Sequence, residues 1–156
     1  MKILIKDLEQ IRNDNADKKI VFLTGTFDLF HVGHLTYLRK AREFGDVLIV
    51  GVNSDSRTKR IKGSSRPFIN QLYRAELVAA QKAVDFAFVM PQSGNQKLRP
   101  SLRILQKLQP DVFLVCDKGW LQASDFCASQ GTKIIFQPRI HRTSTSHIVK
   151  KIIATQ

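Results

Sequence analysis

The sequence contains little cysteine, and it has no apolar run long enough to cross a membrane. Its two cysteines, Cys116 and Cys127, stand at no metal-binding or redox spacing, which argues against a metal or thiol centre. The apolar runs fall well short of the roughly 20 residues of a membrane-spanning helix. The N-terminus becomes charged too soon for a signal peptide. We therefore expect a cytoplasmic protein without a membrane span, and no disulfide in that reducing compartment.

Acidic residues are also scarce, since 13 Asp and Glu stand against 25 Lys and Arg, which gives a formal net charge of +12. A basic chain suits nucleic acid, an anionic membrane or a small polyanionic substrate. Charge alone does not choose among these partners, because a solvated basic surface gives the same count. The basic residues are densest at 57–62, in a stretch that we predict to be a loop rather than a helix.

The 156 residues suit a single domain, 1–156, and 43% of them are hydrophobic, which is enough for a buried core. Strands are predicted at 19–23, 46–52, 86–89, 112–115 and 133–136, and helices at 3–13, 34–44, 70–83, 98–108, 124–130 and 144–153. Within the helix at 70–83, Leu72 is expected on the same face as Ala75 and Ala79. This alternation predicts an α/β fold, a Rossmann-like doubly wound parallel sheet of about five strands with helices on both faces. Ligands of such sheets bind beyond the carboxyl ends of the strands, where we place a long loop at 53–66.

The most informative segment is residues 24–34, which joins a predicted strand to a predicted helix. It contains His31-Val32-Gly33-His34, whose two imidazoles are three residues apart and so share one face of a helix start. Gly33 lets a phosphate chain lie close to the backbone, and the helix start favours an anion. A structural role, or half of a metal site, is the alternative for such a histidine pair. The glycine turn, Asp28 and the strand–helix context favour phosphate, and no third ligand is spaced to complete a metal site.

A second candidate segment is residues 142–146, Arg-Thr-Ser-Thr-Ser, which precedes an apolar-periodic helix. Its hydroxyl groups are good helix caps. They also suit a second anion site at a helix start, with Arg142 on phosphate oxygens. Because the first segment already indicates phosphate, we favour the anion site over capping alone.

These two segments resemble the signatures of the nucleotidyltransferase superfamily. Residues 24–34 are similar to its His-x-Gly-His signature, and residues 143–146 to its second signature, a Ser/Thr run that opens the last helix. Further similarity lies at 50–55, 58–63, 66–67, 74–76, 83–85 and 110–112. Together these stretches, spread over residues 19–152, resemble the cytidylyltransferase-like branch. They resemble most closely the adenylyltransferase domain that makes ADP-heptose from heptose 1-phosphate.

The resemblance implies an enzyme in which a substrate phosphate attacks the α-phosphorus of a nucleoside triphosphate and pyrophosphate leaves. It implies that His31 and His34 stabilise the triphosphate and the transition state, and that Lys59 and Lys62 contact phosphate. The other residues expected to bind the nucleotide are Thr26, Phe27, Asp28, Gly33, Arg42, Asn53, Asp55, Arg74, Asp117, Arg142, Thr143, Ser144, Thr145 and Ser146. Of these, Ser144, Thr145 and Ser146 are expected on the β- and γ-phosphates, and capping is the alternative for Arg74.

The resemblance also implies partners. They are a nucleoside triphosphate, ATP being favoured, with Mg²⁺ held mostly by its phosphates and water, and a phosphorylated sugar or polyol. A homodimer is expected, nucleic acid is not, and no residue is expected to bind metal directly.

One stretch, Cys116-Asp117-Lys118-Gly119-Trp120, departs from the family pattern. Heptose enzymes tend to have Lys-Gly-Gly-Asp-Tyr there, and glycerol-phosphate cytidylyltransferases have Gly-Asp-Asp-Trp. The first alternative function is therefore a glycerol-3-phosphate cytidylyltransferase that uses CTP. The second, which the net charge supports, is a nucleotide- or nucleic-acid-binding module without catalysis. Trp120 is either a core aromatic or a pocket wall.

Overall fold

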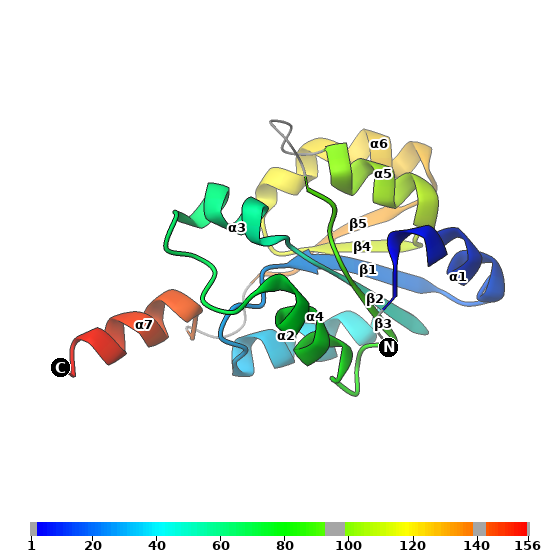
Figure 1. The fold of residues 1–156 in the computed structure, drawn as a ribbon. Helices are drawn as coiled ribbons and strands as arrows, with labels where there is room; N and C mark the ends of the chain where they lie inside the picture. Colours follow the sequence, from blue (N-terminus) through cyan, green and yellow to red (C-terminus); the bar gives the residue numbers. More distant parts are fainter. Residues whose placement is uncertain (1–2, 93–98, 139–142, 156) are drawn as a thin grey trace.

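Five strands form one sheet in the order β3-β2-β1-β4-β5, and every neighbouring pair is parallel (Figure 1). They are β1 (Ile20–Gly25), β2 (Val47–Val52), β3 (Phe86–Val89), β4 (Val112–Val115) and β5 (Lys133–Phe136). The computed structural model describes residues 3–92, 99–138 and 143–155. The chain winds outward from β1 to β3 and then returns to place β4 beside β1. The predicted doubly wound parallel sheet is confirmed, and its winding reverses between β1 and β4.

Helices cover both faces of this sheet (Figure 1). One face carries α1 (Leu8–Asp14), which follows the short 3₁₀ helix η1 (Ile5–Asp7), together with α5 (Arg99–Leu108) and α6 (Ser124–Ser129). The other face carries α2 (Val32–Arg42) and α4 (Gln71–Ala79). Side chains of β1 alternate between the two cores, so that Phe22 packs on the first and Leu23 on the second. Burial on both faces explains why the strands read as unbroken apolar runs.

The stretch 53–66, predicted as a loop, contains a helix, α3 (Asp55–Lys62), so that prediction was wrong. Ser54 caps the helix, since its hydroxyl accepts a hydrogen bond from the backbone N–H of Arg57 at 3.3 Å. Thr58 is the one buried residue of α3. A helix that buries a single residue has no apolar stripe, and this is why periodicity missed it. The basic cluster at 57–62 therefore lies along a helix.

Two helices differ from prediction in ways that matter for the site. α2 begins at Val32 rather than at residue 34, which places His34 within its first turn. α4 is shorter than predicted, and Leu72, expected on its buried face, is 54% exposed. The buried face of α4 is instead formed by Arg74, Ala75 and Val78.

The last helix, α7 (Thr145–Ile153), reaches away from the sheet and its covering helices (Figure 1). Both α7 and α3 lie toward the carboxyl ends of the strands, where the predicted ligand site also falls. Within the described residues, no helix has both the length and the apolar character needed to cross a membrane.

Candidate functional site

The two histidines of the turn after β1 lie with their rings stacked. Their ring centroids are 3.9 Å apart and the ring planes differ by 23°. His31 caps α2, because its Nδ1 accepts a hydrogen bond from the backbone N–H of Gly33 at 3.1 Å. An imidazole whose Nδ1 accepts carries its proton on Nε2 when neutral. His31 can therefore donate from Nε2, as a contact with phosphate requires.

The absence of a side chain at Gly33 allows this arrangement. A Cβ there would stand 2.9 Å from Cε1 and 3.0 Å from Nδ1 of His31, and 3.2 Å from the backbone oxygen of Thr143. These distances are shorter than ordinary van der Waals contact. Gly33 therefore permits both the cap of α2 and the close approach of the segment that leads into α7.

The turn itself holds two residues in the left-handed region, Phe27 with φ 55° and Leu29 with φ 44°. Such conformations are costly for residues other than glycine and are retained where the surroundings enforce them. Phe27 is 2% exposed, and its ring meets the ring of His34 edge-on at a centroid distance of 5.2 Å. The buried Phe27 thus fixes the turn and packs against one side of the His34 ring.

The starts of α2 and α7 lie together. Thr145, the first residue of α7, donates a hydrogen bond from its hydroxyl to the backbone oxygen of Asp28. Neither helix has an acidic residue in its first turn. The positive ends of two helix dipoles therefore meet with no acidic side chain in either first turn to offset them, which favours a bound anion. Ser144 also serves as the N-cap of α7, accepting from the N–H of His147 at 3.2 Å, so the capping role is confirmed.

Asp28, predicted to bind the nucleotide, is 1% exposed and accepts bonds from the protein. Its carboxylate receives the backbone N–H groups of Phe68 at 3.0 Å and Ile69 at 3.1 Å, and an ion pair from Arg66 at 3.0 Å. Asp28 thus ties the turn after β1 to the segment between α3 and α4. Arg66 was not predicted at the site, because nothing local in the sequence pairs it with a residue 38 positions away.

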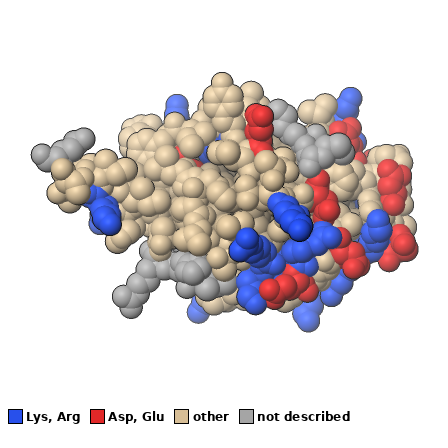
Figure 2. Space-filling model, turned by 90° about the horizontal axis from the view of Figure 1, so that it is seen from below, with Lys and Arg blue, Asp and Glu red and all other residues tan. Residues whose placement is uncertain are grey.

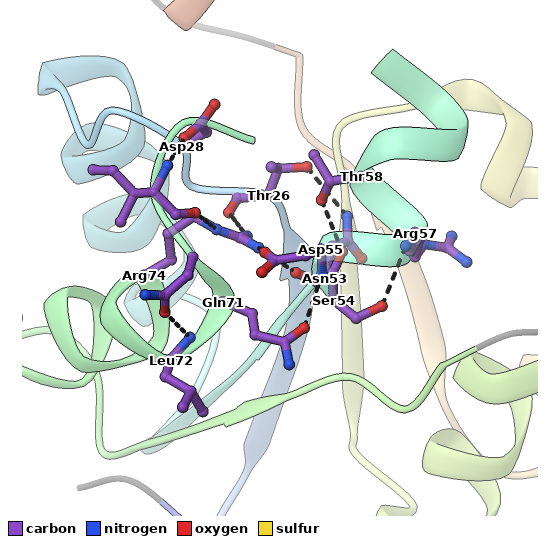
Figure 3. A network of polar contacts seen from close by, with 12 residues as sticks. Thr26, Asp28, Asn53, Ser54, Asp55, Arg57, Thr58, Gln71, Leu72 and Arg74 are labelled. Atoms are coloured by element: carbon purple, nitrogen blue, oxygen red, sulfur yellow. Dashed lines mark hydrogen bonds and ion pairs between the residues drawn. The ribbon is translucent and has the colours of Figure 1, made fainter. Parts of the chain in front are cut away.

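Arg74 is the centre of a second polar network, which joins the carboxyl ends of β1 and β2 (Figure 3). It is fully buried, and it donates to the backbone oxygens of Ile69 at 2.7 Å and Asn53 at 2.9 Å, and also to that of Thr26. It forms an ion pair with Asp55 at 2.6 Å. Arg74, Asn53, Asp55 and Thr26 are thus brought together, as predicted, but the guanidinium of Arg74 is bonded to protein groups. Its contribution is to hold the strand ends in place.

The structure does not bring Arg42 to this site. It lies in the last turn of α2, forms an ion pair with Asp85, and lines an open pocket with Lys18 and Asp46 at the amino ends of the strands. Seen from the side of α2 and α4, the Lys and Arg side chains gather with Asp and Glu at this end of the molecule (Figure 2). Arg42 therefore belongs to a mixed surface at the opposite end from the histidines, and its predicted nucleotide contact is wrong.

Other predicted residues follow the carboxyl ends of β2 and β4. Lys59 and Lys62 are exposed on α3, which begins just after β2. Asp117 follows β4, the neighbour of β1, and caps the 3₁₀ helix η2 (Lys118–Ala123) by accepting from the N–H of Gly119 at 2.9 Å. Trp120 packs edge-on against Phe113 at 5.2 Å, which favours its core role. Arg142 lies outside the described residues.

Tyr37 anchors helix α2 to the sheet. Its phenol donates to the backbone oxygen of Leu114 in β4 at 3.2 Å. Burial raises the pKa of the Tyr37 phenol well above its usual range, and the nearby Cys116 adds to the rise. The phenol therefore stays protonated and keeps this bond at physiological pH, which fixes the helix that carries both histidines.

Comparison with known proteins gives relatives along nearly the whole chain. A family model described as cytidylyltransferase-like matches residues 22–150. Two curated relatives are each called bifunctional protein HldE. The one from Geotalea uraniireducens (strain Rf4) is 38% identical over 86% of this chain and 27% of its own length. The one from Campylobacter curvus (strain 525.92) is 38% identical over 95% of this chain and 31% of its own. The chain thus spans about three tenths of these relatives.

Solved structures show the same fold. A lipopolysaccharide core biosynthesis protein from Thermoplasma volcanium GSS1 matches with a TM-score of 0.66 and 26% identity, over 80% of this chain and 99% of that one. A pantoate-beta-alanine ligase from Francisella tularensis, crystallised with beta-gamma ATP and beta-alanine, matches with a TM-score of 0.65 and 23% identity, over 94% of this chain and 69% of that one. The second likeness concerns the fold alone.

Proposed function

The chain belongs to the cytidylyltransferase-like family, and we propose that it transfers the nucleoside monophosphate of ATP to a phosphorylated sugar of the heptose 1-phosphate type. The observation that carries the proposal is the meeting of two helix starts without acidic residues in their first turns, beside a stacked histidine pair. The resemblance to the adenylyltransferase domain that makes ADP-heptose supports a sugar phosphate as acceptor. A structural neighbour named for lipopolysaccharide core biosynthesis agrees with that choice.

The proposed reaction balances without a covalent enzyme intermediate. A phosphate oxygen of the sugar phosphate forms a bond to the α-phosphorus. The bond from the α-phosphorus to the oxygen that bridges to the β-phosphorus breaks, and pyrophosphate leaves with that oxygen. The protein supplies position and positive charge rather than a nucleophile, as in other phosphoryl transfers.

The proposed roles combine this geometry with the family resemblance. His31 and His34 donate to the phosphates as negative charge moves onto the leaving pyrophosphate. The hydroxyls of residues 144–146 and the N–H groups of the α7 start hold the β- and γ-phosphates. Lys59 and Lys62, exposed on the helix that follows β2, are proposed to contact the phosphates. Arg74 and Asp28 act beneath the site by holding its backbone in place.

Magnesium enters this proposal with the triphosphate. Asp28 is paired with Arg66, and Asp55 is paired with Arg74. In the described part of the chain, no group of three or more His, Cys, Asp and Glu side chains could hold a metal ion. These donor sets fit an ion that keeps phosphate oxygens and water as its ligands, and when bound it would neutralise part of the triphosphate charge.

The net charge is the main argument for nucleic acid as a partner. On the face seen in Figure 2, basic side chains gather among acidic ones and leave most of the surface to other residue types. A nucleic-acid surface needs a continuous basic stripe. The face in Figure 2 shows no such stripe, so we propose phosphorylated small substrates as the partners, and the salt dependence of binding separates them from nucleic acid.

The family also suggests a homodimer, which we propose as the state in solution. Several apolar side chains are exposed on and before α4, namely Phe68, Leu72, Tyr73 and Leu77. Light scattering at several concentrations tests this proposal, and a monomer throughout would refute it.

The experiment that tests the function measures pyrophosphate release over a panel of nucleoside triphosphates and phosphorylated sugars or polyols. We expect the fastest release with ATP and a heptose 1-phosphate. Release confined to CTP with glycerol 3-phosphate would show that the proposed base and acceptor are wrong, and would support the glycerol-3-phosphate cytidylyltransferase instead. No release with any pair, together with salt-sensitive nucleic-acid binding, would refute the enzyme.

A further inference from the structure

Arg66 connects the two halves of the site. It lies between α3 and α4 and is 8% exposed. Its Nη1 donates to Oδ2 of Asp28 at 3.0 Å, and its Nη2 donates to Oγ of Ser146 at 3.3 Å. The guanidinium also stacks over the ring of Phe68, with 4.5 Å from Cζ to the ring centroid. One side chain thus touches the turn after β1 and the first turn of α7.

The two partners of Arg66 differ in how tightly the surrounding structure holds them. Asp28 is buried, and the N–H groups of Phe68 and Ile69 hold its carboxylate from the same segment. Ser146 is exposed, on a helix that reaches away from the sheet (Figure 1). The hydroxyl of Thr145 on Asp28 ties the same turn of α7 to the turn after β1. Arg66 therefore links the start of α7 to the buried carboxylate of Asp28, in the turn that precedes the histidines.

We propose that Arg66 is a positioning residue for the triphosphate, acting through Ser146, an inference that rests on the proposed function. The planar fork of arginine reaches both acceptors at once. A lysine at this position would keep a charge beside Asp28 but has a single nitrogen to serve both partners. The orientation of Ser146, and with it the fit of the α7 start to the β- and γ-phosphates, depends on the second arm of the fork.

A purely structural role for Arg66 makes a different prediction. Removing the guanidinium would leave the buried carboxylate of Asp28 without its counter-charge, so an alanine variant loses stability in either case. Arg66→Lys is the informative change, because it retains a positive charge for Asp28. Arg12→Lys is its matched control. Arg12 forms an ion pair with Asp111 at 2.9 Å that is more exposed than the pair of Arg66, on elements at the amino ends of the strands.

The test measures the affinity of the full chain for α,β-methylene-ATP with Mg²⁺ by calorimetry, in the wild type, Arg66→Lys, Ser146→Ala, the double variant and Arg12→Lys. We expect Arg66→Lys to weaken binding roughly tenfold, the size of one charge-assisted hydrogen bond, and Arg12→Lys to bind as the wild type does. The double variant should bind like Ser146→Ala alone. Wild-type affinity in Arg66→Lys, or a double variant whose loss is the product of the single losses, would overturn the proposal.

The same preparations separate this inference from the proposed function. Suppose that the wild type binds the analogue but that none of the sugar phosphates tested supports pyrophosphate release. The proposed acceptor is then wrong, and the affinities still decide the role of Arg66. If the wild type turns over and the affinities do not couple, the role of Arg66 is wrong and the function stands. Failure of the wild type to bind any nucleotide would overturn both.

Discussion

Replacing Gly33 with alanine should strongly lower activity while leaving the fold intact. The added Cβ would stand 2.9 Å from the His31 ring and 3.2 Å from the oxygen of Thr143. Both neighbours must move by several tenths of an ångström, and they carry one imidazole and the approach to α7. Misplacement of reacting groups on that scale costs about 100-fold in rate, so we expect kcat/KM to fall by about that factor or more.

The stability of this variant should change little. Alanine is favoured over glycine in a helix by up to about 1 kcal/mol. Loss of the bond from the Gly33 N–H to His31 costs about 1 kcal/mol in the opposite direction. We therefore expect the free energy of unfolding, measured in urea, to stay within about 1 kcal/mol of the wild type, because these two effects offset each other.

Gly45 provides the matched control, since it follows the other end of the same helix. A Cβ at Gly45 would stand 2.5 Å from the backbone oxygen of Lys19, which cannot move without disturbing β1. Gly45→Ala should therefore lower stability and leave KM for the nucleotide unchanged. A Gly33→Ala protein with wild-type kcat/KM in the pyrophosphate assay would show that activity does not require glycine at this turn.

His34→Ala should lower kcat by about 100-fold or more with an unchanged circular dichroism spectrum, and unchanged turnover would show that the chemistry lies elsewhere. Arg74→Met should lower the free energy of unfolding by about 3 kcal/mol or more, because it leaves Asp55 and three carbonyl oxygens without their donor. A loss under about 1 kcal/mol would contradict the role of Arg74 as the centre of this polar network. Burial raises the pKa of the Cys127 thiol, which lowers its thiolate fraction at any given pH. Iodoacetamide at pH 8 should therefore modify the half-buried Cys116 first. Equal rates of modification, measured by mass spectrometry, would contradict that order.

The sheet and the two motif-bearing helix starts could be predicted because their signals are local. Parallel strands buried on both faces read as continuous apolar runs, and the spacing of His31, Gly33 and His34 fixes their relation on one helix turn. The helix α3 left no such signal, because it buries only Thr58 and its single apolar residue, Ile61, is exposed.

The polar residues were harder to assign because their partners are distant in the chain. Arg42 follows the histidine motif closely in sequence, yet a helix rises 1.5 Å per residue, which carries it about 15 Å along α2 to the other end of the sheet. Arg74 bonds to carbonyl oxygens 21 and 48 positions away, and Arg66 bonds to Ser146 at a distance of 80 positions. Only the folded chain shows that these guanidinium groups hold the site together.

The most direct test of the central claim is a crystal structure of the protein with α,β-methylene-ATP and Mg²⁺. We expect the β- and γ-phosphates to lie between the starts of α2 and α7, within hydrogen-bond distance of an imidazole nitrogen of the histidine pair and of the hydroxyls at 144–146. Density for the triphosphate elsewhere, such as the pocket of Arg42 and Asp85 at the amino ends of the strands, would contradict it.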